Sequence, residues 1–246
     1  TKNGWADQVL HYPTEEDLIR NWADILFRNN RGIDELNDVP LSDGEMAQVL
    51  EQVRLLSSPL QLNGFINGGS VTIIRDNKED ALHYGSPVSL YLFDKRAVSG
   101  GPSVYQIAEQ PMFKSKNAML HDRRGDFMLL INGIPVIHVE LKKTGIPLSQ
   151  AYNQIDLYNH EHVFTGIFSL IQFFVAMTPS DMVYFANPGD GEKLNKDYFF
   201  HWEDFNNEIQ GDWKYIARHF LNIPMAHQMV GSYTVADHSD GILKVM

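Results

Sequence analysis

Two apolar runs around an Asn-Gly dipeptide constrain this fold more than any other feature, and residues 125–143 read GDFMLLINGIPVIHVELKK. Asn-Gly between apolar runs is the strongest short signal for a β-hairpin. Because side chains alternate along a strand, His138, Glu140 and Lys142 share one face of the second run. A strand that packs one face and presents an acid and an amine from the other suggests a metal-dependent site built on a sheet.

The register of this hairpin decides whether Asp126 can join that site. A regular hairpin with a two-residue turn would pair Asp126 with Val139 and place Glu140 on the opposite face. A shared carboxylate site therefore requires a three-residue loop or a β-bulge. Pro135 cannot donate to a strand ladder, which favours a bulge. We predict that the loop between the two strands contains an odd number of residues.

The chemistry of a joint site follows from its side chains. Two neighbouring carboxylates, Asp126 and Glu140, repel each other unless a cation lies between them. Oxygen ligands of this kind suit Mg²⁺, which lowers the pKa of a bound water and stabilises charge on a phosphate. Lys142 can orient that water or hold a phosphate. The simpler alternative is a strand edge with solvated Glu140 and Lys142, and spacing alone leaves both open.

Composition bounds the class of protein. The chain has 246 residues, of which 43% are apolar and 21% charged, as in a globular protein with a real core. The absence of cysteine excludes disulfides and thiolate metal sites, and fits a reducing cytoplasm. The start of the sequence is polar, so we expect no signal peptide. The longest apolar run, 166–177, is too short to cross a bilayer. We expect a cytoplasmic protein without membrane association.

The net charge of −11 is unfavourable for a nucleic-acid enzyme, because phosphate binding usually needs a basic surface. The basic residues near the hairpin form a local group: Lys114, Lys116, Arg123, Arg124, Lys142 and Lys143. We therefore expect weak DNA binding by this chain alone, with other domains or subunits holding the DNA.

Periodicity predicts an α/β fold with a mixed sheet. Thr14 with Asp17, and Ser42 with Glu45, are capping-box signatures that open helices over 14–29 and from 42 onward. The remaining expected elements follow in chain order: a turn and strand in 64–74, strands in 88–93 and 105–111, the hairpin, a helix over 148–160, a buried central strand over 167–177, a strand over 182–187, and a mostly helical segment over 202–223.

The hairpin, ending in Glu-Leu-Lys, and the following Gln154 and Tyr158 resemble the PD-(D/E)xK nuclease superfamily. More specifically, the chain is similar to the N-terminal endonuclease domain of the restriction and translocation (R) subunit of type I restriction–modification enzymes. Thr14-Glu-Glu-Asp-Leu resembles that family's opening helix, and Tyr184-Phe-Ala-Asn a later strand. Gly125 departs from the proline of the superfamily's name, at a position that carries no chemistry.

The resemblance implies a restriction-endonuclease-like core, with a mixed central sheet flanked by helices. It also implies a nuclease domain over 1–225 and a connector over 226–246, leading to a helicase-like motor that this chain lacks. The sequence has no GxxxxGK[ST] phosphate loop, so ATP would serve only the missing motor domains.

Residue by residue, the resemblance implies that Asp126 and Glu140 bind the metal, with the carbonyl of Leu141 as a further ligand. Lys142 would position the attacking water and offset developing phosphate charge. The implied reaction is Mg²⁺-dependent hydrolysis of double-stranded DNA, within a complex that includes methyltransferase and specificity subunits.

Gln154 and Tyr158 would support the site from the adjacent helix, and Glu15 would reach the metal from the first helix. Each has a structural alternative: the pair can simply pack on its helix, and an acid such as Glu15 favours the helix dipole in any first turn. His138 either tunes the site or is a structural, hydrogen-bonded histidine.

Two function classes remain. The first is the nuclease domain of a motor-driven restriction enzyme. The second is a non-catalytic docking or DNA-binding module with a nuclease-like fold, which the acidic charge favours. The intact set of Asp126, Glu140 and Lys142 favours the nuclease, since a degenerate site is expected to lose one of them.

Overall fold

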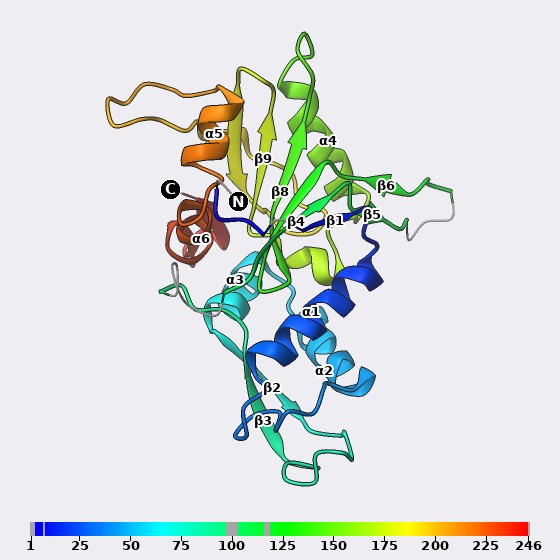
Figure 1. The fold of residues 1–246 in the computed structure, drawn as a ribbon. Coiled ribbons are helices and arrows are strands. Elements are labelled where there is room, and N and C mark those ends of the chain that lie inside the picture. Colours follow the sequence, from blue (N-terminus) through cyan, green and yellow to red (C-terminus); the bar gives the residue numbers. More distant parts are fainter. Residues whose placement is uncertain (1–2, 7, 97–102, 116–118, 246) are drawn as a thin grey trace.

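A six-stranded mixed sheet forms the centre of the protein, in a computed structural model that describes residues 3–6, 8–96, 103–115 and 119–245 (Figure 1). The strand order is β1-β4-β7-β8-β9-β10, with parallel pairing in β1–β4 and β8–β9 and antiparallel pairing in the rest. The strands are β1 Val9–His11, β4 Tyr105–Glu109, β7 Phe127–Ile131, β8 Ile134–Leu141, β9 Phe173–Met177 and β10 Met182–Ala186.

Helices flank this sheet, which confirms the expected fold class and is compatible with a restriction-endonuclease-like core. The α-helices are α1 Glu15–Asn29, α2 Asp43–Arg54, α3 Pro59–Asn67, α4 Ser149–His160, α5 Trp213–His219 and α6 Met225–Gln228. Shorter turns are the 3₁₀ helices η1 Gly166–Leu170 and η2 Lys196–Tyr198, and the π-helix η3 Met229–Tyr233. The described part of the chain contains no helix with the length and apolar character that a membrane crossing requires.

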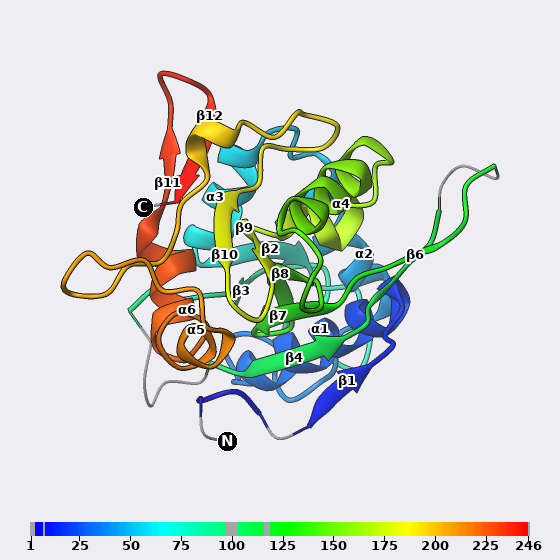
Figure 2. The same ribbon diagram turned by 90° about the horizontal axis from the view of Figure 1, so that it is seen from above.

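Three two-stranded sheets extend the body. They are β2 Ser70–Ile74 with β3 Pro87–Tyr91, β5 Met112–Phe113 with β6 Arg123–Arg124, and β11 Thr234–Asp237 with β12 Ile242–Val245. The β5–β6 arm and the loop at 201–211 project from opposite sides of the molecule (Figure 2). β11 and β12 contact α3, and β12 contacts β10, so the two strands over 234–245 pack on the body. The assignment of 226–246 as a connector stays a prediction.

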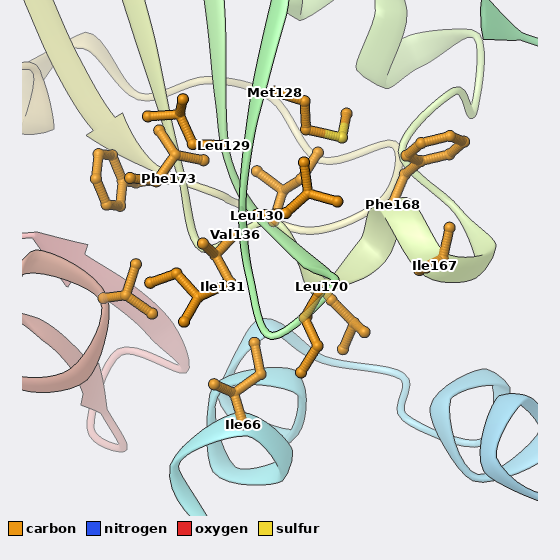
Figure 3. Close-up of a cluster of buried hydrophobic side chains, with 14 of the residues drawn as sticks. Ile66, Met128, Leu129, Leu130, Ile131, Val136, Ile167, Phe168, Leu170 and Phe173 are labelled. Carbon is orange, nitrogen blue, oxygen red and sulfur yellow. The ribbon is translucent and has the colours of Figure 1, made fainter. Parts of the chain in front are cut away.

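The core lies against the central hairpin. Side chains of β7 and β8 meet those of η1, β9 and α3, and Ile66 of α3 lies below the hairpin tip (Figure 3). Every residue from Ile134 to Glu140 is buried, which holds this strand rigidly in the sheet. A rigid strand is the best support for side chains that must keep a fixed geometry.

The β7–β8 turn itself contains two residues, so the predicted odd loop count is wrong. Asn132 has φ 52° and Gly133 has φ 81°, as a two-residue type I′ turn requires. The alternative that we gave, a β-bulge, is confirmed: the register shifts between Leu129 and Leu130, and Val136 is the extra residue of β8.

The bulge restores the face that the site needs. Beyond it Phe127 pairs with Val139, so Asp126, which directly precedes β7, stands opposite Glu140. Regular pairing throughout would have placed Asp126 opposite Val139. One inserted residue therefore brings the two carboxylates to the same side of the hairpin.

Three predicted elements differ in the structure. Residues 64–67 belong to the C-terminal half of α3, so only the later part of 64–74 is strand. The buried run over 167–177 divides into η1 and β9, and β9 does lie inside the sheet. The 202–223 segment is helical only in α5; its first half forms a hairpin-like loop closed by a bridge between Glu203 and Ile209.

The β2–β3 ribbon is joined to α2 by a buried charge cluster. Arg75 is fully buried, with Glu45 and Asp80 as its carboxylate partners. The Arg75 guanidinium also donates to the carbonyl oxygens of Leu36 and Val39. Because each charge in this cluster has a partner, its burial is tolerated, and it fixes the loops around the ribbon.

Candidate active site

The two predicted carboxylates meet where β7 begins and β8 ends. Asp126 is held there by the backbone, since the Leu141 N–H donates to its Oδ2 at 2.7 Å. Glu140 is buried, with a 1% exposed side chain, and Asp126 is half-buried. The site therefore lies at the end of two strands and opens towards solvent on the Asp126 side.

A chain of hydrogen bonds connects Glu140 to the helix α4. Lys142 Nζ donates to Glu140 Oε1 at 2.9 Å and to Gln154 Oε1 at 2.6 Å. Gln154 Nε2 donates to the Tyr158 hydroxyl at 2.6 Å, and that hydroxyl donates to the Arg124 carbonyl oxygen at 3.0 Å. The helix thus fixes the position of the lysine amine, and the arm strand β6 anchors the helix side of the network.

The ionisable groups at this site shift one another's pKa values. Burial and the neighbouring Glu140 carboxylate raise the pKa of Asp126 above its ordinary value, against the Leu141 N–H and Lys142. Burial also acts to raise the pKa of Glu140, but His138 and Lys142 outweigh it and lower that pKa. Burial, and then the charge of Glu140, raise the pKa of Tyr158. Of the two carboxyl groups, Glu140 therefore keeps its negative charge more readily.

Asp126 and Glu140 fit a hard cation. Their repulsion raises the pKa of Asp126, and Glu140 Oε2 is buried without a hydrogen-bond partner among the described residues. A cation between them would relieve both features. Within the described ranges no group of three or more His, Asp or Glu side chains is arranged to hold a metal. An ion here would keep several waters, as Mg²⁺ does.

His138 is a buried member of the same strand face. Its Nε2 lies 3.5 Å from Glu140 Oε2, and its side chain has no exposed surface. Rings of Phe113, Phe164 and Phe174 surround it. Neither ring nitrogen has a regular hydrogen-bond partner in the described part of the chain, and both sequence interpretations of His138, a site-tuning and a structural histidine, stay predictions.

Glu15 lies elsewhere. Its Oε1 accepts from the Ile167 N–H at 3.3 Å, at the start of η1, and its carboxylate borders Gly166. Among the described contacts none joins Glu15 to Asp126 or Glu140. The structure thus brings together six of the seven predicted site residues, all except Glu15: Asp126, Glu140, Leu141, Lys142, Gln154 and Tyr158.

Sequence patterns did not indicate two supports of the site. Arg123 Nε donates to Glu161 Oε2 at 2.7 Å, which ties the β5–β6 arm to the end of α4. The Arg124 carbonyl oxygen receives the Tyr158 hydroxyl. The only signal for either was the local group of basic residues; of that group, Lys116 lies outside the described residues.

The fold and this site define a mixed α/β protein with two carboxylates and a lysine at the end of a central hairpin. Residues 12–193 match the family model described as type I restriction enzyme R protein N terminus. The chain belongs to this family.

Curated relatives agree with the family. The chain is similar to the endonuclease subunit of the type I restriction enzyme SsaAORF53P of Staphylococcus saprophyticus, with 30% identity over 99% of this chain and 24% of the relative. It is also similar to the endonuclease subunit of SauMSSORF170P of Staphylococcus aureus, with 29% identity over 94% of this chain and 23% of the relative. For that of EcoprrI of Escherichia coli the identity is 26%, over 94% of this chain and 77% of the relative. The chain thus spans about a quarter of the length of the staphylococcal relatives.

Proposed function

We propose that this chain is the Mg²⁺-dependent endonuclease domain of a type I restriction enzyme R subunit, with a PD-(D/E)xK site. It would hydrolyse DNA phosphodiester bonds after ATP-driven translocation by motor domains outside this sequence. The observation that carries the proposal is the position of Lys142, whose amine donates both to Glu140 and to Gln154. A solvated lysine at a strand edge has no reason to be held from two elements.

Each residue has a role in this proposal. Asp126 and Glu140 would hold the ion, with the Leu141 carbonyl as the predicted third protein ligand. A bound Mg²⁺ supplies a lowered water pKa and stabilises charge on the phosphate. Lys142 orients the attacking water and offsets developing negative charge. Gln154, itself bonded to Tyr158, keeps the amine of Lys142 in place.

The partners in this proposal are double-stranded DNA and the methyltransferase and specificity subunits of the restriction complex. The names of the relatives as subunits support membership of a multisubunit enzyme. The net charge of −11 supports a complex in which other parts of the enzyme make most of the contacts with DNA. Lys114 and Arg124 are exposed and would give local phosphate contacts.

The alternative is a non-catalytic docking or DNA-binding module with the same fold. The acidic charge favours it. It leaves unexplained why a lysine, a glutamine and a tyrosine form one continuous hydrogen-bonded chain onto a buried glutamate. A docking surface would not need an ordered polar network at a strand end.

The test is Lys142→Ala in the full-length subunit assembled with its partners, with Lys143→Ala as the matched control. Lys143 is the next residue and exposed, so the control removes an equal charge outside the network. We expect Lys142→Ala to lose cleavage by about 100-fold or more while ATP hydrolysis and translocation continue. Full cleavage by Lys142→Ala would refute the assignment, and would favour the docking module.

A further inference from the structure

His138 is the most unusual buried polar group near the site. Its imidazole is fully buried among the rings of Phe113, Phe164 and Phe174, with ring centroids 5.4–6.2 Å away. Burying a polar ring without hydrogen bonds costs free energy. A plain core position would be filled more favourably by an apolar side chain, so the imidazole must serve something that an apolar side chain cannot.

The polar group that His138 faces is Glu140. Three buried atoms lack a hydrogen-bond partner here among the described residues: both ring nitrogens of His138 and Oε2 of Glu140. Two of these, Nε2 and Oε2, lie 3.5 Å apart. This is slightly longer than a regular N–H···O bond, so a small shift of either side chain would form one.

Lys142 already holds the other oxygen of the same carboxylate, Oε1, at 2.9 Å. A carboxylate oxygen has two lone pairs, so each oxygen can accept one hydrogen bond and still bind a cation. Donors at both oxygens would fix the rotation of the Glu140 carboxylate group about the Cγ–Cδ bond. A fixed carboxylate loses less freedom when it binds an ion.

The backbone makes room for this arrangement. A Cβ atom at Gly125 would lie 2.6 Å from His138 Cε1 and 3.1 Å from a ring carbon of Phe113. The imidazole therefore fills the space that a side chain at position 125 would occupy. This explains in physical terms why glycine replaces the proline of the PD-(D/E)xK pattern here: a prolyl ring and the His138 imidazole exclude each other.

We propose that His138 is a positioning residue for Glu140, whose Nε2–H donates to Oε2 and orients the carboxylate for the divalent cation. The inference rests on the proposed function, because it assumes that Glu140 is a metal ligand. Gly125 and His138 form a matched pair in this account, in which the small residue admits the larger one. Removing the donor while preserving the packing should weaken the ion's binding and leave the fold intact.

The test compares His138→Gln with His138→Met in the full-length subunit. Both replacements are unbranched and of similar length, but only glutamine can donate a hydrogen bond. The probe is Mn²⁺, titrated without DNA or ATP and followed by electron paramagnetic resonance of the free ion. An Asp126→Asn, Glu140→Gln double variant defines the binding that belongs to this site. The Mn²⁺ concentration for half-maximal cleavage by the assembled enzyme is the second readout.

We expect His138→Met to weaken Mn²⁺ binding, or to raise the Mn²⁺ requirement of cleavage, by about 10-fold or more, with His138→Gln much closer to the unmodified protein. Equal Mn²⁺ dependence of the two variants would overturn the inference and leave His138 as a packing residue. Failure of the proposed function looks different: the Asp126→Asn, Glu140→Gln variant would then cleave normally. Thermal unfolding without metal shows whether each variant is folded.

Discussion

At the scale of single residues, the site is defined by what each side chain excludes as well as by what it contacts. Gly125 has buried surroundings that admit no Cβ, because His138 and Phe113 occupy that space. Gly64, in the second half of α3, is the opposite case: a Cβ there would meet nothing within 4 Å. The same substitution should therefore have opposite effects at the two positions.

We predict that Gly125→Ala lowers the free energy of unfolding by about 1–3 kcal/mol, since overpacking displaces His138 or the backbone. Gly64→Ala should raise it by about 0.5–1 kcal/mol, because alanine is the better helix former. Urea unfolding of both variants measures the two effects. Combining Gly125→Ala with His138→Ala should recover part of the loss; an unchanged stability of Gly125→Ala would contradict the packing shown here.

The site residues were predictable from sequence where their spacing along a strand or helix places them on the same face of that element. Glu140 and Lys142 share a strand face, and Gln154 and Tyr158 are one helical turn apart, so sequence brings each pair together. Glu15 could not be placed this way, because its partner, the Ile167 N–H, is 152 positions away in the chain. The aromatic surroundings of His138 come from three separate segments and were equally beyond sequence.

At the scale of elements, the sequence predicted the starts of helices correctly where a local capping signal marks them. The capping boxes of Thr14 and Ser42 are both present at the starts of α1 and α2. The same signature at Ser58 and Gln61 opens α3, which we did not predict, because Gly64 and the short length hid its periodicity. The 202–212 segment has helix-like apolar spacing, but it forms a loop closed by the bridge between Glu203 and Ile209, next to the bridge of Phe200 with Tyr184 of β10.

The bulge at Val136 shows what sequence could and could not give. An Asn-Gly turn predicts the hairpin, and Pro135 indicated an irregularity beside it. Sequence did not decide between a longer loop and a bulge. The choice depends on how the strand packs on both faces, with β8 buried over nearly its whole length.

The cluster that joins α2 to the β2–β3 ribbon should respond to acid. Burial acts to raise the pKa of Asp80, but Arg75, His83 and Asn37 outweigh it and lower that pKa from 3.8 to about 2. A lowered folded-state pKa adds stability that is fully present above pH 3.8 and is lost as pH falls towards 2.

We predict that Asp80→Asn destabilises the protein at neutral pH, and that its difference from the unmodified chain shrinks as pH falls from about 4 to about 2. The variant keeps the size of the side chain but leaves the buried Arg75 with one fewer carboxylate. Unfolding free energies measured by denaturant between pH 2 and 7 test this. A difference that stays constant across that range would show that Asp80 carries no charge-dependent stability.

At the scale of the whole molecule, the chain is acidic overall but carries a small group of basic residues and a pair of carboxylates at one strand end. It belongs to the family described as type I restriction enzyme R protein N terminus, and it spans about a quarter of the length of its staphylococcal relatives. A net charge of −11 opposes a strong grip on DNA, so the proposed reaction depends on DNA being delivered by other parts of the enzyme.

The central claim is that the carboxylates of Asp126 and Glu140 belong to a nuclease site. The most direct measurement follows DNA cleavage and ATP hydrolysis in the same sample of assembled enzyme, with Asp126→Asn and Glu140→Gln tested separately. Asp122→Asn is the control, since Asp122 is an exposed acid four positions before Asp126 in the chain, and it accepts from the Ser115 N–H. The account predicts that both site variants hydrolyse ATP normally and lose Mg²⁺-dependent cleavage, while the control keeps it. Normal cleavage by either site variant would contradict it.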